Sequence, residues 1–78
     1  MSLKLQEKFW QADWTYMRLY QEYETHKGGH IAVTYYYYGD DEPNYKAYER
    51  MAKEAAYEKY IRLLKENKDL SLDYIIEL

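Results

Sequence analysis

The stretch that decides the class of fold runs from residue 31 to residue 38 and reads Ile-Ala-Val-Thr-Tyr-Tyr-Tyr-Tyr. It is rich in β-branched and aromatic residues, contains neither Pro nor Gly, and is bounded by Gly29 and Gly39. These features predict a strand. Because neighbouring residues of a strand point to opposite faces, at most two of the four tyrosines can face one core. A lone strand leaves its backbone groups unpaired, so the stretch also requires a neighbouring strand.

On the C-terminal side of this strand, residues 39–44 read Gly-Asp-Asp-Glu-Pro-Asn and predict a loop that leads into a helix. Asp and Asn cap helix N-termini, and Pro is tolerated in the first turn. We expect the helix over residues 45–67, with one face formed by Tyr45, Tyr48, Ala52, Ala55, Ala56 and Leu63. Pairs of opposite charge at i, i+4 support its exposed side, namely Glu49 with Lys53 and Glu58 with Arg62.

The last segment, residues 70–78, permits two interpretations. Its alternate residues are apolar, as in a strand: Leu70, Leu72, Tyr74, Ile76 and Leu78. Ser71 is also suited to cap a short third helix that ends at Leu78. The alternation and the need of residues 31–38 for a neighbour favour the strand, which would complete a right-handed βαβ unit. In the helical interpretation, the tyrosine strand pairs across a dimer or with residues 3–5.

On the N-terminal side, apolar residues recur at intervals of 4, 3, 4, 3 and 4: Leu5, Phe9, Ala12, Tyr16, Leu19 and Tyr23. This spacing predicts an amphipathic helix over residues 3–26. Lys27 and the pair Gly28-Gly29 supply a stop signal for it. The expected fold class is therefore α+β and helix-dominated, with two long helices and one Tyr-rich strand in a single domain over residues 1–78.

Composition narrows the functional classes. The chain has 78 residues, a formal net charge of -3, twelve tyrosines and no cysteine, which excludes disulfides, thiolate metal sites and thiol nucleophiles. The mild acidity opposes binding to phosphate backbones, so nucleic acid is not the expected partner. No apolar stretch reaches the roughly 18 residues needed to span a bilayer, and the N-terminus lacks a signal-peptide pattern. We expect a soluble, cytoplasmic protein with no membrane partner.

Candidates for catalysis or metal binding are weak. His26 and His30 stand four residues apart across a Gly-Gly turn, but a metal would need a third ligand, and the acids near residue 40 are the only obvious donors. The run Asp40-Asp41-Glu42 lacks the ligand spacing of a calcium loop. The only serines, Ser2 and Ser71, lie near the ends of the chain and suggest no catalytic triad. We expect a non-enzymatic protein without metal or cofactor.

The tyrosine run and the acidic loop after it form the predicted binding surface. Tyr offers a large, rigid, amphipathic contact area at low entropic cost and is enriched at protein-binding hot spots. We expect a partner protein, with a basic surface, to contact Tyr35, Tyr36, Tyr37, Tyr38, Asp40, Asp41 and Glu42. Strand geometry leaves one alternate pair of tyrosines for this role. The alternatives are a homodimer seam, and base stacking on a single strand, which would require a basic groove.

In composition the chain resembles the small, acidic, Tyr-rich proteins that phages and other mobile elements use to inhibit host machinery, anti-CRISPR proteins among them. This resemblance implies a viral inhibitor that binds a protein in the host cytoplasm, and it assigns no residue roles. The wide apolar faces of both expected helices support a second hypothesis, a self-associating structural protein or a de novo designed scaffold without catalytic function. The helix-favouring block over residues 53–60 is typical of a designed sequence.

Overall fold

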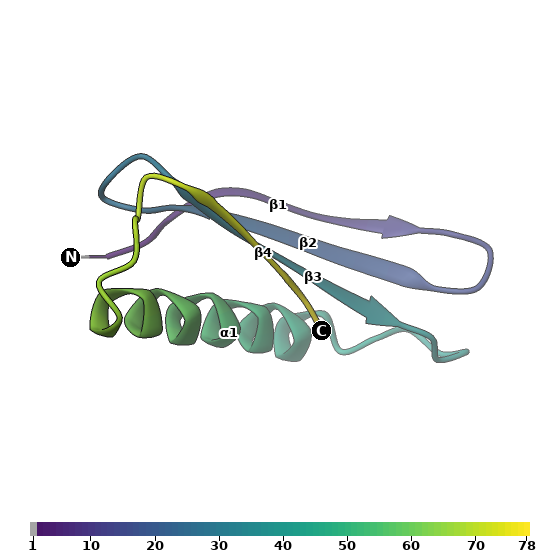
Figure 1. Ribbon diagram of the computed structural model, residues 1–78. Coiled ribbons are helices and arrows are strands. Elements are labelled where there is room, and N and C mark those ends of the chain that lie inside the picture. The colour runs from purple at the N-terminus through teal and green to yellow at the C-terminus, as the bar shows by residue number, and fades with distance from the viewer. Residues whose placement is uncertain (1) are drawn as a thin grey trace.

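A four-stranded sheet with one helix on one of its faces forms the structure, a computed structural model that describes residues 2–78 (Figure 1). The elements in chain order are β1 (Lys4–Ala12), β2 (Met17–Glu24), β3 (His30–Tyr37), α1 (Tyr45–Lys65) and β4 (Asp73–Glu77). The strands lie in the order β1-β2-β3-β4, with the first two pairs antiparallel and the last pair parallel. The prediction of a helix-dominated fold with two long helices is therefore wrong.

The segment expected to be the first helix is a β-hairpin. In β2 the buried residues alternate, Leu19, Gln21 and Tyr23 facing the core, which is the period of a strand. The helical spacing joined residues that lie on opposite faces of the sheet: Phe9 stacks on Tyr20, away from the core, whereas Leu19 is fully buried. The helical spacing was a coincidence produced by the apolar residues of two amphipathic strands on either side of a turn.

The pair Gly28-Gly29 forms the turn between β2 and β3 instead of ending a helix. Gly28 has a φ of +85°, a conformation that favours glycine, and its N–H donates to the carbonyl oxygen of Thr25 over 3.1 Å. The N–H of Thr25 donates to the carbonyl oxygen of Gly29 over 2.8 Å, which closes the turn.

The secondary structure predicted downstream of residue 29 agrees with the structure, but Glu49 forms its ion pair with Lys8 of β1 over 3.3 Å and not with Lys53. The tyrosine strand is β3, and Asn44 caps α1 by accepting a hydrogen bond from the backbone N–H of Ala47 over 3.1 Å. The segment 70–78 contains β4, so its interpretation as a strand is right and the third helix is wrong. β4 runs parallel to residues 30–34 of β3, and α1 is the crossover between them.

The core lies between α1 and the two central strands. Leu19, Ile31 and Val33 have no exposed surface and pack with the helix side chains Ala52, Ala56, Tyr60 and Leu63. The alanines are fully buried, so α1 lies close to the sheet. The opposite face of the sheet carries no helix, and we call it the open face (Figure 1). Within residues 2–78 no helix combines the length and the apolar character that crossing a membrane requires.

Candidate protein-binding site

The alternation of β3 divides the tyrosine run between the two faces of the sheet. Tyr35 and Tyr37 face α1, where their rings lie 4.8 and 5.5 Å from the ring of Tyr48. Tyr36 and Tyr38 stack on each other at 6.4 Å on the other side. Of the four predicted tyrosines, the structure therefore leaves two for a binding surface.

A third tyrosine, from the β1–β2 turn, joins the exposed pair. The ring of Tyr16 lies 5.3 Å from that of Tyr36 and 5.8 Å from that of Tyr38. Met17 pairs with Tyr37 in the register of β2 and β3, which places the β1–β2 turn beside the loop between β3 and α1. Both loops lie at the same end of the elongated molecule, which measures 42 Å along its longest axis (Figure 1).

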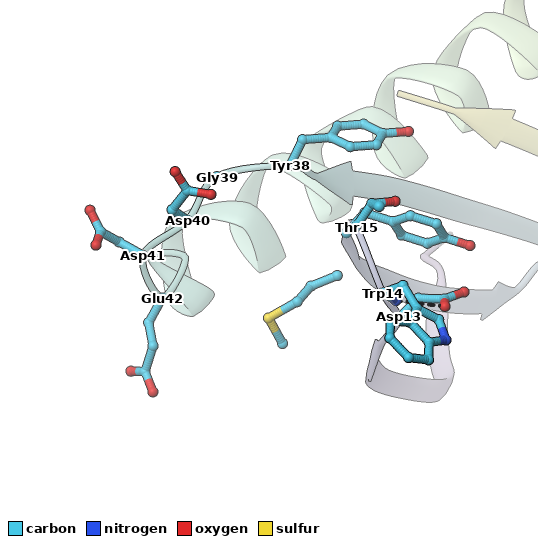
Figure 2. Close-up of a pocket in the computed structure, with 10 residues that line it drawn as sticks. Asp13, Trp14, Thr15, Tyr38, Gly39, Asp40, Asp41 and Glu42 are labelled. Carbon is cyan, nitrogen blue, oxygen red and sulfur yellow. Dashed lines mark hydrogen bonds between the residues drawn. The ribbon is translucent and has the colours of Figure 1, made fainter.

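A cleft of about 570 Å³ opens between these two loops (Figure 2). Its walls combine aromatic and acidic side chains, and we call it the acidic-aromatic cleft: Asp13, Trp14, Thr15, Tyr16, Met17, Tyr38, Gly39, Asp40, Asp41 and Glu42. Four of the predicted site residues, Tyr38 and the three acids of the loop, belong to it. Tyr36 lies next to it, whereas Tyr35 and Tyr37 face the helix.

Sequence reasoning missed Asp13, Trp14 and Tyr16, because it placed them inside a helix. A turn signal was present: Asp is favoured at the first position of a turn, where its side chain bonds the backbone that follows. In the structure the Asp13 carboxylate accepts from the N–H of Trp14 over 2.7 Å, and the N–H of Asp13 donates to the carbonyl oxygen of Tyr16 over 2.8 Å.

The charged side chains that line the cleft are all acidic. Its lining includes four carboxylic acids and no Lys, Arg or His. A hydrogen bond to Asp13, together with its negative charge, raises the pKa of Tyr16 above its ordinary value of 10.0. Burial, and after it the charge of Asp41, raises the pKa of Tyr37. These shifts keep Tyr16 and Tyr37 neutral at physiological pH, so neither adds charge to that of the carboxylates.

Trp14 is a large apolar side chain of the cleft that the fold leaves in water. It is 98% exposed at the tip of the β1–β2 hairpin, and Figure 2 shows it across the cleft from the acidic loop. Burying a tryptophan side chain removes roughly 150 to 250 Å² from water, on the order of 4 kcal/mol before the entropic costs of association. An indole left in water by the fold is the type of residue that anchors protein interfaces.

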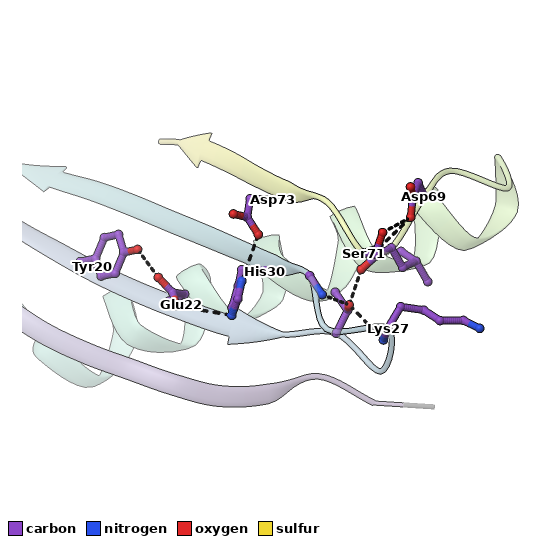
Figure 3. A network of polar contacts seen from close by, with 10 residues as sticks. Tyr20, Glu22, Lys27, His30, Asp69, Ser71 and Asp73 are labelled. Carbon is purple, nitrogen blue, oxygen red and sulfur yellow. Dashed lines mark hydrogen bonds and ion pairs between the residues drawn. The ribbon is translucent and has the colours of Figure 1, made fainter.

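The residues considered for metal binding or catalysis are separated. His26 Nδ1 lies 2.7 Å from the hydroxyl of Tyr60, whereas His30 Nδ1 lies 3.0 Å from a carboxylate oxygen of Asp73 (Figure 3). Ser71 donates its hydroxyl to Asp69 over 2.6 Å and forms part of a turn. Among residues 2–78 no three His, Cys, Asp or Glu side chains are grouped so that they could hold a metal ion.

No protein-family model, curated protein or solved structure matches this chain.

Proposed function

We propose that this protein is a non-enzymatic interaction module whose acidic-aromatic cleft binds a basic segment of a partner protein. One observation carries the proposal: a fully exposed indole, Trp14, lies beside four acidic side chains in a cleft that contains no basic one. The same acids disfavour a phosphate backbone, so the proposed partner is a protein rather than a nucleic acid.

The chemistry of Lys and Arg fits both features of the cleft. Their aliphatic stems pack on apolar surface while the charged ends remain free to pair. An ammonium or guanidinium over an indole gains about 0.5 to 2 kcal/mol by cation–π attraction. The carboxylates of Asp40, Asp41 and Glu42 add long-range attraction, which raises the association rate more than the affinity.

The compositional resemblance to phage and mobile-element inhibitors extends the proposal. Nucleic-acid-binding enzymes of a host cell carry basic surfaces of this kind, and a small acidic protein seated on such a surface would exclude the nucleic acid. On this proposal the protein acts in the cytoplasm of the host by occupying a basic site.

Calorimetry with a synthetic Lys- and Arg-rich peptide tests the cleft directly. Trp14→Ala and the double variant Asp40→Lys, Asp41→Lys should each weaken binding by about tenfold or more, because each removes one of the two attractions. The matched control is Glu54→Lys with Glu66→Lys, which makes the same change of net charge at exposed positions of α1 and at its C-terminal cap. An equal loss of affinity in the control variant would mean that only the net charge of the protein matters, and would refute binding at the cleft.

A second candidate function, self-association, is favoured by a different observation. Four large apolar side chains of α1 and of the segment around β4 are 47 to 75% exposed: Ile61, Leu72, Ile75 and Leu78. A symmetric partner that covered them would add to a thin core. Sedimentation equilibrium at high micromolar concentration tests for self-association. A single species of 9.6 kDa would exclude this function.

A further inference from the structure

β4 is an edge strand whose outer backbone groups are free. The carbonyl oxygen of Leu72 accepts from His30 N–H over 3.2 Å, and Leu78 N–H donates to Thr34 over 2.9 Å. Residues 72, 74, 76 and 78 therefore turn their backbone groups toward β3, and strand alternation turns those of 73, 75 and 77 outward. Within residues 2–78 no strand lies beyond β4 on that side.

The same three residues present an acidic, an apolar and a second acidic side chain on the open face. Ile75 is 75% exposed, and the side chain of Asp73 is 75% exposed. Glu77 is also exposed, whereas Tyr74 and Ile76 pack against the core. The edge thus offers unpaired backbone and a pattern of acid, isoleucine, acid at alternate positions.

A depression of about 500 Å³ on the open face adjoins this edge. The small residues Ala32 and Thr34 of β3 line it, together with Tyr20 of β2 and Ile75 of β4. In the register of the sheet, Ala32 lies between Glu22 and Ile75, and Thr34 lies between Tyr20 and Glu77. An apolar side chain from an added strand would pack against Ile75, at the rim of this depression.

We propose that the edge of β4 accepts an extended basic segment of a partner protein as a fifth strand, with Lys or Arg opposite Asp73 and Glu77 and an apolar residue opposite Ile75. Backbone hydrogen bonds to an exposed sheet edge supply affinity, and alternate side chains supply specificity. The pattern basic-x-apolar-x-basic reads the same in both directions, so it fits a parallel or an antiparallel strand.

Charge complementarity selects this occupant over a second copy of the chain. An antiparallel pair of β4 strands centred on Ile75 would place Asp73 of one copy opposite Glu77 of the other, and like charges directly opposite are destabilising. The other edge of the sheet, β1, carries both signs of charge and an irregular register between Leu5 and Glu7. His30 occupies only the Oδ1 atom of Asp73, which leaves Oδ2 to a basic side chain (Figure 3).

This surface differs from the acidic-aromatic cleft. β4 pairs with residues 30–34 of β3, whereas the cleft begins beyond Tyr37 at the opposite end of that strand. The inference therefore stands independently of the proposed function. Trp14→Ala, which damages the cleft, should leave binding at the edge of β4 unchanged.

The test uses the short peptide Thr-Lys-Thr-Val-Thr-Lys-Thr. Its alternate residues Lys, Val and Lys match the acid, isoleucine, acid pattern of β4. Nuclear magnetic resonance of the whole protein should show slowed hydrogen exchange of the Ile75 and Glu77 amides when the peptide binds. Two N-methylated peptides provide the matched control, one methylated on the amides that face β4 and one on the amides that face away. The first should bind about tenfold more weakly, since it cannot donate to the edge, and the second should bind as the parent does.

Two protein variants complete the test. Glu77→Lys should weaken binding about tenfold by reversing one charge, with Glu54→Lys on α1 as the control. Ile75→Pro removes an outward N–H that β3 does not use, a position where an edge strand tolerates proline, and should abolish binding. If that variant does not fold, the N-methylated pair still decides. Equal protection of the Ile75 and Glu77 amides by the two methylated peptides, loss of that protection in Trp14→Ala, protection of β1 amides instead of β4 amides, or no binding at all would overturn the inference.

Discussion

The backbone N–H of Gly29 donates a hydrogen bond to the carbonyl oxygen of Leu70 over 3.2 Å, and so joins the β2–β3 turn to the segment that enters β4. The hydroxyl of Thr25 donates to the same carbonyl oxygen and also accepts from the N–H of Gly29 over 3.1 Å. A side chain at position 29 would collide with the carbonyl oxygens of Leu70 and Leu72. The close approach of two backbones at Gly29 therefore sets where β4 starts beside His30.

The two glycines of this turn should respond differently to alanine. Gly28→Ala should lower the free energy of unfolding by roughly 1 kcal/mol, because Gly28 has a φ of +85° but open space around it. Gly29→Ala should cost at least about 2 kcal/mol more, because the backbone of 70–72 must move away. Urea unfolding of the two variants measures the difference. Equal losses would mean that β4 does not approach Gly29 as described.

A buried polar pair in the core should show strong coupling. Gln21 is 2% exposed and donates to the hydroxyl of Tyr23 over 2.8 Å, while its Oε1 has no hydrogen-bond partner. Tyr23→Phe should cost about 1 to 3 kcal/mol, because it leaves the Gln21 amide buried without its acceptor. Adding Gln21→Leu should recover most of this loss, since both polar partners are then gone. A double-mutant cycle with no coupling energy would contradict this arrangement.

The contacts of His30 with Glu22 and Asp73 on the open face should make the free energy of unfolding depend on pH. The hydrogen bond that the His30 ring donates to Asp73, and after it the charges of Asp73, Glu22 and Glu24, raise the pKa of His30 above 6.5. A raised pKa in the folded state means that the stabilisation is fully present below about pH 6.5 and is lost as the pH rises through the folded value. Asp73→Asn should lower this pKa and reduce that pH dependence.

Proton NMR titration of the His30 ring, combined with urea unfolding on either side of neutrality, measures both effects. The stability lost in Asp73→Asn should be larger on the acid side of the window than on the alkaline side. A loss that grows with pH would have the wrong sign for a protonated His30 and would refute the assignment.

The two tryptophans should report different environments. Trp10 donates its indole N–H to Glu49 over 2.8 Å and packs edge-on against Tyr45, whereas Trp14 is almost entirely in water. Trp14→Ala should change the free energy of unfolding by no more than about 0.5 kcal/mol, and Trp10→Ala should lower it by about 2 kcal/mol. Acrylamide should quench the fluorescence of Trp10→Phe, which retains Trp14, more strongly than that of Trp14→Phe. The reverse order would place Trp14 in a contact.

Alternate tyrosines of β3 should separate stability from binding. Tyr35→Ala with Tyr37→Ala should lower the free energy of unfolding by about 3 kcal/mol or more, because both rings pack on Tyr48. Tyr36→Ala with Tyr38→Ala should cost only about 1 kcal/mol of stability yet abolish binding of the basic peptide to the cleft. Thermal unfolding and calorimetry on both variants check this. A collapsed fold in the second variant would mean that these tyrosines serve the core.

Local sequence signals predicted the strands and the helix in the second half of the chain. β-branched and aromatic residues bounded by Gly29 and Gly39 correctly predicted β3, and an asparagine with proline before it correctly predicted the start of α1. The alternation in residues 70–78 correctly favoured β4. Local residues gave one interpretation for β3 and for α1, whereas the choice of a strand for residues 70–78 also depended on the need of β3 for a neighbouring strand.

For residues 3–26 the order of amino acids shows only that apolar and aromatic side chains recur, a pattern that suits one helix or two strands. Tertiary structure decided between them, because β2 gains a full row of hydrogen bonds from β3 while burying Leu19, Gln21 and Tyr23 under α1. The pairing of β2 with β3 also forms the acidic-aromatic cleft. Trp14 and the acidic loop are more than twenty residues apart in the chain, and only the pairing of Met17 with Tyr37 places them side by side.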